Sequence, residues 1–122
     1  MKYLIVDDSP TFRRILINAL AALGFDKIIE AKDGMDALDK LTNETFDMIF
    51  TDWNMPIMNG LEFVQTLKAN ATYQKIPIIM VTTRGNKEDI IDALKAKVDN
   101  YLVKPFTPAN LKSKIDATLL KF

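Results

Sequence analysis

The sequence contains no histidine and no cysteine among its 122 residues. Without histidine, the chain has no imidazole base, no serine–histidine–aspartate triad and no imidazole metal ligand. Without cysteine, it has no disulfide, no thiolate nucleophile and no zinc–thiolate site. Any chemistry must therefore use carboxylates, hydroxyls, lysine, arginine, backbone groups or a hard metal ion held by oxygen ligands.

An excess of one charge and long apolar runs are also missing. Lysine and arginine number 16, and aspartate and glutamate also number 16, so the formal net charge is zero. A balanced charge without a basic block argues against binding driven by nucleic-acid phosphates. No apolar run approaches the roughly 20 residues of a membrane-spanning helix, and the first residues lack the apolar segment of a signal peptide. The sequence therefore predicts a soluble, cytoplasmic protein.

Short apolar runs alternate with helix-like stretches along the whole chain. The runs predict strands at 3–6, 27–29, 48–51, 78–81 and 101–103. The periodicity predicts helices at 10–23, 35–41, 61–68, 87–95 and 108–122. Strands that alternate with helices indicate an α/β fold, in which a parallel sheet is covered on both faces and the crossovers are right-handed. We expect one domain over residues 1–122, with no output domain.

The ends of two helices carry clear signals. Ser9 precedes Pro10, and Thr107 precedes Pro108, so that a capping side chain is followed by proline at the first helical position in both cases. Gly24 stands where a glycine commonly ends a helix. The run at 27–29 is shorter and more mixed than the others, which is typical of an edge strand.

Reactive side chains follow the predicted strands. Asp7 and Asp8 come after the first strand, Asp52 after the third, Thr82 after the fourth and Lys104 after the fifth. Ligands of open α/β sheets bind outside the carboxyl ends of the strands. Each aspartate taken alone is more typical of a solvated turn, but the joint pattern indicates one site.

Carboxylates gathered at one edge need a positive partner. Two of them about 4 Å apart repel by roughly 4 kcal/mol at an effective dielectric constant near 20. In the absence of imidazole and thiolate ligands, the cluster favours a hard cation, and a few carboxylates with phosphate and water are how Mg²⁺ usually binds. Asp52 is then a candidate nucleophile for a phosphoryl group, whose charge Mg²⁺ and Lys104 would neutralise.

These residues resemble the signature of two-component response-regulator receiver domains. The resemblance extends in order and spacing over the whole chain, and the residues that carry it are Asp7, Asp8, the run 52–56, Asn59, Gly60, Thr82, Tyr101 and the run 104–106. The runs 53–56 and 104–107 are most similar to the chemotaxis regulators of that family. The resemblance implies a flavodoxin-like α/β fold of five strand–helix units with the parallel strand order 2-1-3-4-5.

The resemblance also implies a role for each site residue. Asp52 would be the phosphoacceptor. The Mg²⁺ ligands would be Asp7, Asp8 and Asp52, with the backbone carbonyl of Asn54 as a further ligand. Lys104 would contact the phosphoryl group, and its peptide bond to the following proline would be cis.

A switch and partners are implied in the same way. Thr82 would move toward the phosphoryl group and Tyr101 would occupy the released space, which would alter the surface of helix four, strand five and helix five at approximately 87–122. The resemblance implies a histidine kinase as the donor, and the phosphohistidine would have to belong to that partner because this chain has no histidine of its own. The effector would be the flagellar motor switch protein or another protein, and a phosphatase is a further expected partner. We expect a monomer that catalyses its own phosphorylation and slow dephosphorylation.

Three residues differ from the family pattern, and the single tryptophan directly follows Asp52. Lys97 stands where the family often has glycine, so that turn must tolerate a non-glycine conformation or be made differently. Thr83 is bulkier than the residue usually found beside the switch hydroxyl, and Arg84 replaces an acidic residue common in close relatives. Both bear on the lifetime of the phosphoryl group. We expect Trp53 to pack over the site, partly exposed.

Other functions remain open from the residues alone. A phosphorelay intermediate would use the same site but pass the phosphoryl group to a separate histidine protein. An Mg²⁺-dependent phosphatase with an aspartyl nucleophile would need an acid–base aspartate two residues later, where this chain has Asn54. A flavin-binding module would need a hydroxyl-rich and glycine-rich loop after the first strand, where Asp7 and Asp8 would repel the flavin phosphate.

Overall fold

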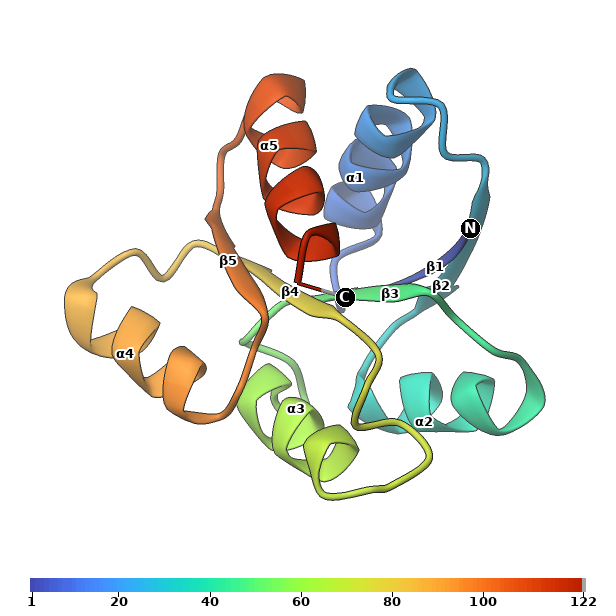
Figure 1. Ribbon diagram of the computed structural model, residues 1–122, viewed down its shortest axis with the longest axis vertical. Coiled ribbons are helices and arrows are strands. Elements are labelled where there is room, and N and C mark those ends of the chain that lie inside the picture. The colour runs from blue at the N-terminus through green and yellow to red at the C-terminus, as the bar shows by residue number, and fades with distance from the viewer. Residues whose placement is uncertain (122) are drawn as a thin grey trace.

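Strands and helices alternate strictly in the computed structural model, which describes residues 1–121 (Figure 1). In chain order the elements are β1 (Lys2–Val6), α1 (Pro10–Ala22), β2 (Lys27–Ala31), α2 (Gly34–Asn43), β3 (Met48–Thr51), α3 (Gly60–Lys68), β4 (Ile78–Thr82), α4 (Lys87–Lys95), β5 (Asn100–Val103) and α5 (Pro108–Leu119). This succession confirms the alternation predicted from the apolar runs. The predicted end of the last helix, Phe122, lies outside the described residues.

The strands form one parallel sheet in the order β2-β1-β3-β4-β5. Helices α1 and α5 lie on one side of it, and α2, α3 and α4 lie on the other (Figure 1). The α/β fold class, the strand order implied by the resemblance and the edge position of β2 are therefore confirmed. Because β1, β3 and β4 all lie inside the sheet, their carboxyl ends are next to one another.

The predicted helix starts are found where the capping residues placed them. The side chain of Ser9 accepts a hydrogen bond from the backbone amide of Phe12 and so caps α1. Thr107 and Asn110 form a reciprocal capping box at the start of α5. Gly24, after α1, has a φ of 95°, which is the left-handed conformation that glycine adopts at helix ends.

The turn after α4 uses a lysine in the same conformation. Lys97 has a φ of 74°, so the chain tolerates a non-glycine residue in the left-handed region. Its amide donates to the carbonyl of Leu94 at 3.0 Å, and the amide of Val98 donates to Ala93. These bonds close the turn and satisfy the last carbonyls of the helix.

Two apolar clusters hold the layers together, one on each side of the sheet. Successive strand side chains point to opposite faces, so Leu4 and Ile49 join the cluster under α2, α3 and α4, whereas Ile5 and Phe50 join the cluster under α1 and α5. All four side chains are fully buried. The central strands are thereby fixed from both sides, and the residues at their carboxyl ends stand on a rigid base.

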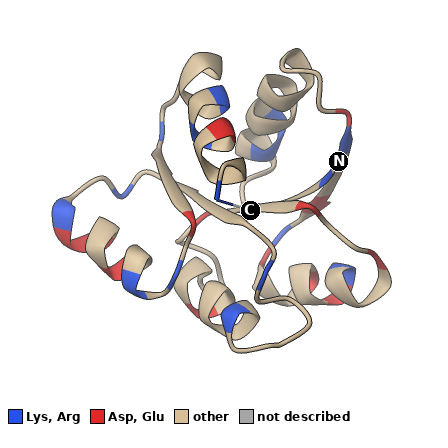
Figure 2. Ribbon diagram, in the orientation of Figure 1, with Lys and Arg blue, Asp and Glu red and all other residues tan. Residues whose placement is uncertain are grey.

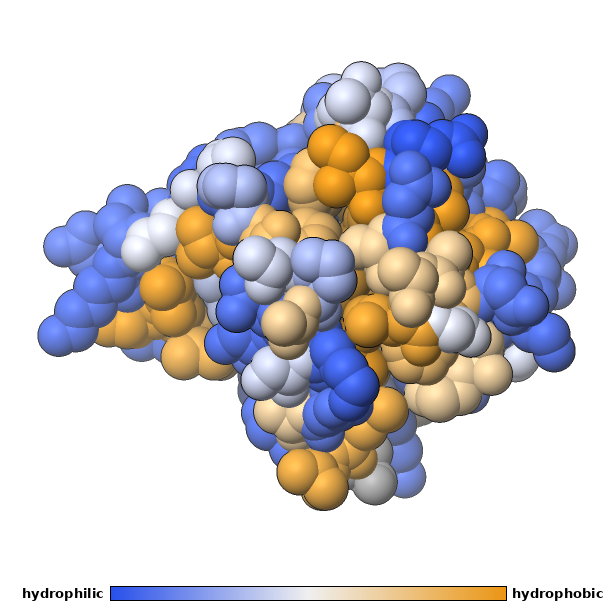
Figure 3. All heavy atoms as spheres, turned by 90° about the horizontal axis from the view of Figure 1, so that it is seen from above, coloured by the Kyte–Doolittle hydropathy of each residue, from blue (hydrophilic) through white to orange (hydrophobic). Residues whose placement is uncertain are grey.

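The surface mixes charged and apolar groups. Basic and acidic residues are interspersed over the ribbon (Figure 2), and from the side of α1 and α5 the apolar groups lie among hydrophilic ones (Figure 3). The balanced net charge is therefore not separated into one acidic and one basic face.

Over residues 1–121, every helix is too short or too polar to cross a membrane.

Candidate functional site

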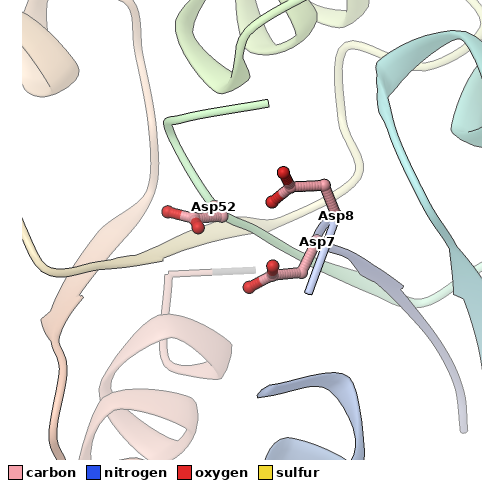
Figure 4. A group of neighbouring side chains, drawn as sticks. All are labelled: Asp7, Asp8 and Asp52. Carbon is pink, nitrogen blue, oxygen red and sulfur yellow. The ribbon is translucent and has the colours of Figure 1, made fainter. Parts of the chain in front are cut away.

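Three carboxylates converge at the carboxyl ends of β1 and β3. The two strands are neighbours, and Val6 is paired with Thr51. The residues that follow them, Asp7 and Asp52, therefore lie side by side at the edge of the sheet. Carboxylate oxygens of Asp7, Asp8 and Asp52 all lie within 4.8 Å of one another (Figure 4). The convergence predicted from the strand ends is therefore present in the fold.

Lys104 brings a positive charge into this cluster from the end of β5. Its Nζ donates to Oδ2 of Asp7 at 3.0 Å and to Oδ2 of Asp52 at 3.1 Å. Both ion pairs are largely shielded from water, since the Lys104 side chain is 11% exposed. The ammonium thus bridges the two carboxylates that lie deepest in the site.

The Asp7 carboxylate is held firmly in place. Its Oδ1 accepts from the backbone amide of Ser9 at 2.8 Å. The backbone carbonyl of the same residue accepts from Nη1 of Arg13 at 2.6 Å. Burial raises the pKa of the Asp7 carboxyl, and the opposing effects of the Ser9 amide and the Lys104 ammonium do not cancel this rise. The ionised form of Asp7 is therefore a destabilising element that a bound cation would relieve.

The charge and the donor set fit a hard divalent cation. With the groups ionised, three carboxylates and one ammonium leave two negative charges, and every available ligand atom is oxygen. Oxygen ligands with a double negative charge suit Mg²⁺. Asn54 lies on the loop that follows β3, and its assignment as a ligand through the backbone carbonyl stays a prediction.

Trp53 is buried, in contrast to the expectation that it would be partly exposed. It is 6% exposed and belongs to the apolar cluster under α2, α3 and α4. Its backbone amide donates to Oδ1 of Asp52 at 2.6 Å, and its carbonyl accepts from the amide of Gly60 at 2.7 Å. The indole is therefore a core group, and the Trp53 backbone links the Asp52 carboxylate to the start of α3. The burial was not predicted from the sequence, because exposure depends on how the loop folds back.

The loop between Asp52 and α3 is unusually tight. Ile57 has a φ of 69° although it is β-branched, and the amide of Met58 donates to the carbonyl of Pro56, which closes a γ-turn around it. Gly60 packs so closely that a Cβ atom there would lie 1.9 Å from the carbonyl oxygen of Asp52. The glycine is therefore required by the close approach of two backbone segments.

Thr82 and Tyr101, the pair implied as a switch, both contact the backbone of Arg84. Thr82 is fully buried, and its Oγ1 accepts from the Arg84 amide at 3.3 Å. Tyr101 is 7% exposed, and its hydroxyl donates to the Arg84 carbonyl. The two side chains are therefore connected through the backbone of one intervening residue.

The Arg84 side chain contacts two segments near the site, the loop after β3 and the first turn of α4. Its Nε and Nη2 donate to Oδ1 of Asn54 at 3.2 and 2.7 Å, and its guanidinium lies 4.5 Å from the centroid of the Trp53 ring. Its Nη1 is 3.7 Å from a carboxylate oxygen of Asp89 in the first turn of α4. The sequence marked Arg84 only as a departure from the family pattern, since Asn54 and Trp53 are distant from it in the chain.

The phenol of Tyr101 should make the fold sensitive to strong alkali. Burial, followed by the charge of Asp89, raises the pKa of Tyr101 from its ordinary value of 10.0 to about 12. A group whose pKa is higher in the folded state contributes stability below the unfolded-state value and loses it as the pH rises to the folded-state value. We therefore expect the free energy of unfolding to fall between about pH 10 and pH 12.

Urea denaturation of the wild type and of Tyr101→Phe over this pH range measures the effect. The fall should be smaller in the variant. A remaining part is expected from Tyr3, whose pKa is also raised by burial. Identical falls in the two proteins would contradict the placement of the Tyr101 hydroxyl.

Comparisons with known proteins show what this chain is similar to. The family model described as the response regulator receiver domain matches residues 3–116. A relative called chemotaxis protein CheY homolog, from Campylobacter jejuni, is 55% identical over 120 residues, which are 98% of this chain and 92% of the relative.

Solved structures extend the likeness to three dimensions. The chemotaxis response regulator CheY4 of Vibrio cholerae is 35% identical with a TM-score of 0.87, over 96% of this chain and 97% of that one. The receiver domain of a sensor histidine kinase from Pseudomonas aeruginosa, solved with a magnesium ion coordinated in its active-site cleft, is 27% identical with a TM-score of 0.82, over 92% and 91% of the chains. Sequence and structure thus point to one family.

Proposed function

This chain belongs to the response regulator receiver domain family, and we propose that it is a chemotaxis response regulator that accepts a phosphoryl group on Asp52. The observation that carries the proposal is the bridge from Lys104 to Asp7 and Asp52 inside an all-oxygen cluster. A carboxylate that faces an ammonium and further acidic groups is suited to phosphoryl transfer, where most of the catalysis is positioning and charge stabilisation.

The donor in this proposal is the phosphohistidine of a histidine kinase. A carboxylate oxygen of Asp52 forms the new O–P bond, the P–N bond of the donor breaks, and its electron pair stays on the imidazole nitrogen. The Lys104 ammonium pairs with oxygens of the incoming group. The backbone amide of Trp53 holds the other oxygen of Asp52. Mg²⁺, held by Asp7, Asp8, Asp52 and the Asn54 carbonyl, would neutralise charge on the phosphoryl oxygens.

The signal would leave the site through Thr82 and Tyr101. Thr82 would donate its hydroxyl proton to a phosphoryl oxygen, and the shift would reach Tyr101 through the Arg84 backbone that both contact. A change in population from 1:99 to 99:1 needs about 5.5 kcal/mol. Charge-assisted hydrogen bonds of roughly 1.5–3 kcal/mol each supply that amount.

The proposed output is protein binding by the face that α4, β5 and α5 form. Its exposed apolar side chains include Ile91, Leu94 and Val103. In a chemotaxis regulator, the partner would be the flagellar motor switch, and the kinase would supply the phosphoryl group that controls this binding. The receiver domain itself would then carry the readout.

The single tryptophan tests the metal and phosphoryl site directly. Trp53 adjoins Asp52 and lies under the Arg84 guanidinium, so both Mg²⁺ and beryllium fluoride, a phosphoryl mimic, should change its fluorescence. Asp7→Asn is the matched control, because asparagine keeps an acceptor for the Ser9 amide but loses the charge. We expect at least about tenfold weaker Mg²⁺ binding in this variant.

Asp7→Asn should also melt at a higher temperature than the wild type in Mg²⁺-free buffer. The raised pKa of Asp7 means that its ionised form costs stability at neutral pH, and the substitution removes that cost. A wild-type fluorescence that responds to neither Mg²⁺ nor beryllium fluoride would contradict the proposed function.

A further inference from the structure

We infer that Phe12 is a positioning residue that holds the Lys104 ammonium in the site through the face of its aromatic ring. The Nζ of Lys104 lies 3.5 Å from the centroid of the Phe12 ring. Cations within about 6 Å of a ring centroid are attracted by its quadrupole. Phe12 also packs against the apolar cluster under α1 and α5, a role that any large apolar residue could fill.

A continuous series of contacts that begins and ends at Asp7 fixes the Phe12 ring relative to the Lys104 ammonium. Oδ1 of Asp7 accepts from the Ser9 amide, and Oγ of Ser9 accepts from the Phe12 amide at 3.2 Å. The Phe12 ring faces Nζ of Lys104, and Nζ returns to Oδ2 of Asp7 at 3.0 Å. The residue that caps α1 therefore sets both the carboxylate and the aromatic face between which the ammonium lies.

A second aromatic residue supports the ring. The centroid of Phe106 lies 6.0 Å from that of Phe12, and the planes meet at 81° in an edge-to-face arrangement. Such pairs are favourable beyond the area that they bury. Because Phe106 follows Lys104 closely in the chain, the loop after β5 contributes both the ammonium and the support for the ring that holds it.

The ring contact differs from the carboxylate contacts in what phosphorylation does to it. When Asp52 forms its O–P bond, one of its oxygens becomes part of the acyl phosphate, and the ion pair with Lys104 changes. The quadrupole of Phe12 does not change, so the ring still attracts the ammonium. We expect the attraction of the ring to keep Lys104 within reach of the phosphoryl oxygens throughout the transfer. This expectation rests on the proposed function.

The ground-state geometry is tested without any phosphoryl donor. A proton above the face of an aromatic ring experiences a ring-current shift, so the ε-methylene protons of Lys104 should resonate upfield of ordinary lysine positions in nuclear magnetic resonance spectra. The shift should persist in Phe12→Tyr, which keeps the ring, and vanish in Phe12→Leu. Lysine shifts that are the same in all three proteins would overturn the inference.

The kinetic role is tested with acetyl phosphate as the probe. Phe12→Leu should be phosphorylated about fivefold more slowly than the wild type, whereas Phe12→Tyr should stay within about twofold of it. In a Lys104→Gln background the Phe12→Leu substitution should have no further effect, because the ring then has no ammonium to hold. Thermal melting of each variant provides the check that it is folded.

These experiments distinguish a failure of the proposed function from a failure of the positioning role of Phe12. A wild type that acetyl phosphate does not phosphorylate would contradict the proposed function, while the lysine shifts would still decide whether Phe12 holds the ammonium. An equal slowing by Phe12→Leu with and without the lysine would overturn the positioning role, since a merely structural effect of the smaller side chain is independent of Lys104.

Discussion

Asp52→Asn is expected to abolish covalent phosphorylation while the chain remains folded. An amide lacks the anionic oxygen that forms the acyl phosphate, so the asparagine cannot act as the phosphoacceptor. The fold should persist because the asparagine oxygen can still accept from the Trp53 amide, which lies 2.6 Å from Oδ1 of Asp52. Lys104 also keeps its ion pair with Asp7.

Intact-protein mass spectrometry after incubation with a phosphorylated histidine kinase or with acetyl phosphate measures this loss. Asp8→Asn is the matched control, because it removes a carboxylate from the same cluster but leaves the proposed nucleophile. It should slow phosphorylation without preventing it. A phosphoryl group that is retained in Asp52→Asn and lost in Asp8→Asn would reassign the nucleophile to Asp8.

Gly60→Ala is expected to destabilise the protein strongly and to disturb the segment next to Asp52. The added Cβ atom would lie 1.9 Å from the Asp52 carbonyl oxygen and 2.8 Å from Cα of Trp53. Both are backbone atoms, so the clash is relieved only if α3 or the loop after β3 moves. Alanine in a helix is intrinsically favoured over glycine by up to about 1 kcal/mol, and the clash must outweigh that gain.

The net loss should reach about 2–3 kcal/mol, in the range typical of severe steric changes. Urea denaturation measures it, and the emission of Trp53 reports the movement of the loop. Gly85→Ala is the matched control, since its Cβ would lie 3.3 Å from a methyl group of Val103 and would approach no backbone atom within 4 Å. We expect that variant to lose less than about 1 kcal/mol. Wild-type stability and emission in Gly60→Ala would contradict the close approach of the two backbones.

Local chemistry explains why much of this protein is predictable from its sequence. Ser9 and Thr107 cap helices through bonds to amides three residues later, and such short-range contacts depend on little else. The apolar runs at β1, β3 and β4 carry their own strand signal because both faces of a central parallel strand are buried. The alternation of strands and helices then brings Asp7, Asp8 and Asp52 to one edge.

Boundaries and burial were less predictable. The helix expected at 35–41 is longer in the structure, because Asp33 caps it and it begins at Gly34. Trp53 follows a reactive residue and was expected to pack over the site, partly exposed. It is instead buried, because the loop after β3 folds back onto α3 through the bond from Gly60. The burial of Trp53 is not encoded in the residue types of one short window.

The sequence by itself determined the fold class, the helix starts and the set of acidic, hydroxyl and ammonium groups that meet at one edge of the sheet. Only the tertiary structure decided how these groups are held. Lys104 meets Asp7 across 97 positions of the chain, and Arg84 meets Asn54 across 30. The Phe12 ring faces the Lys104 ammonium only because side chains from distant segments pack together. Periodicity and capping are local, whereas such contacts exist only after the layers have packed.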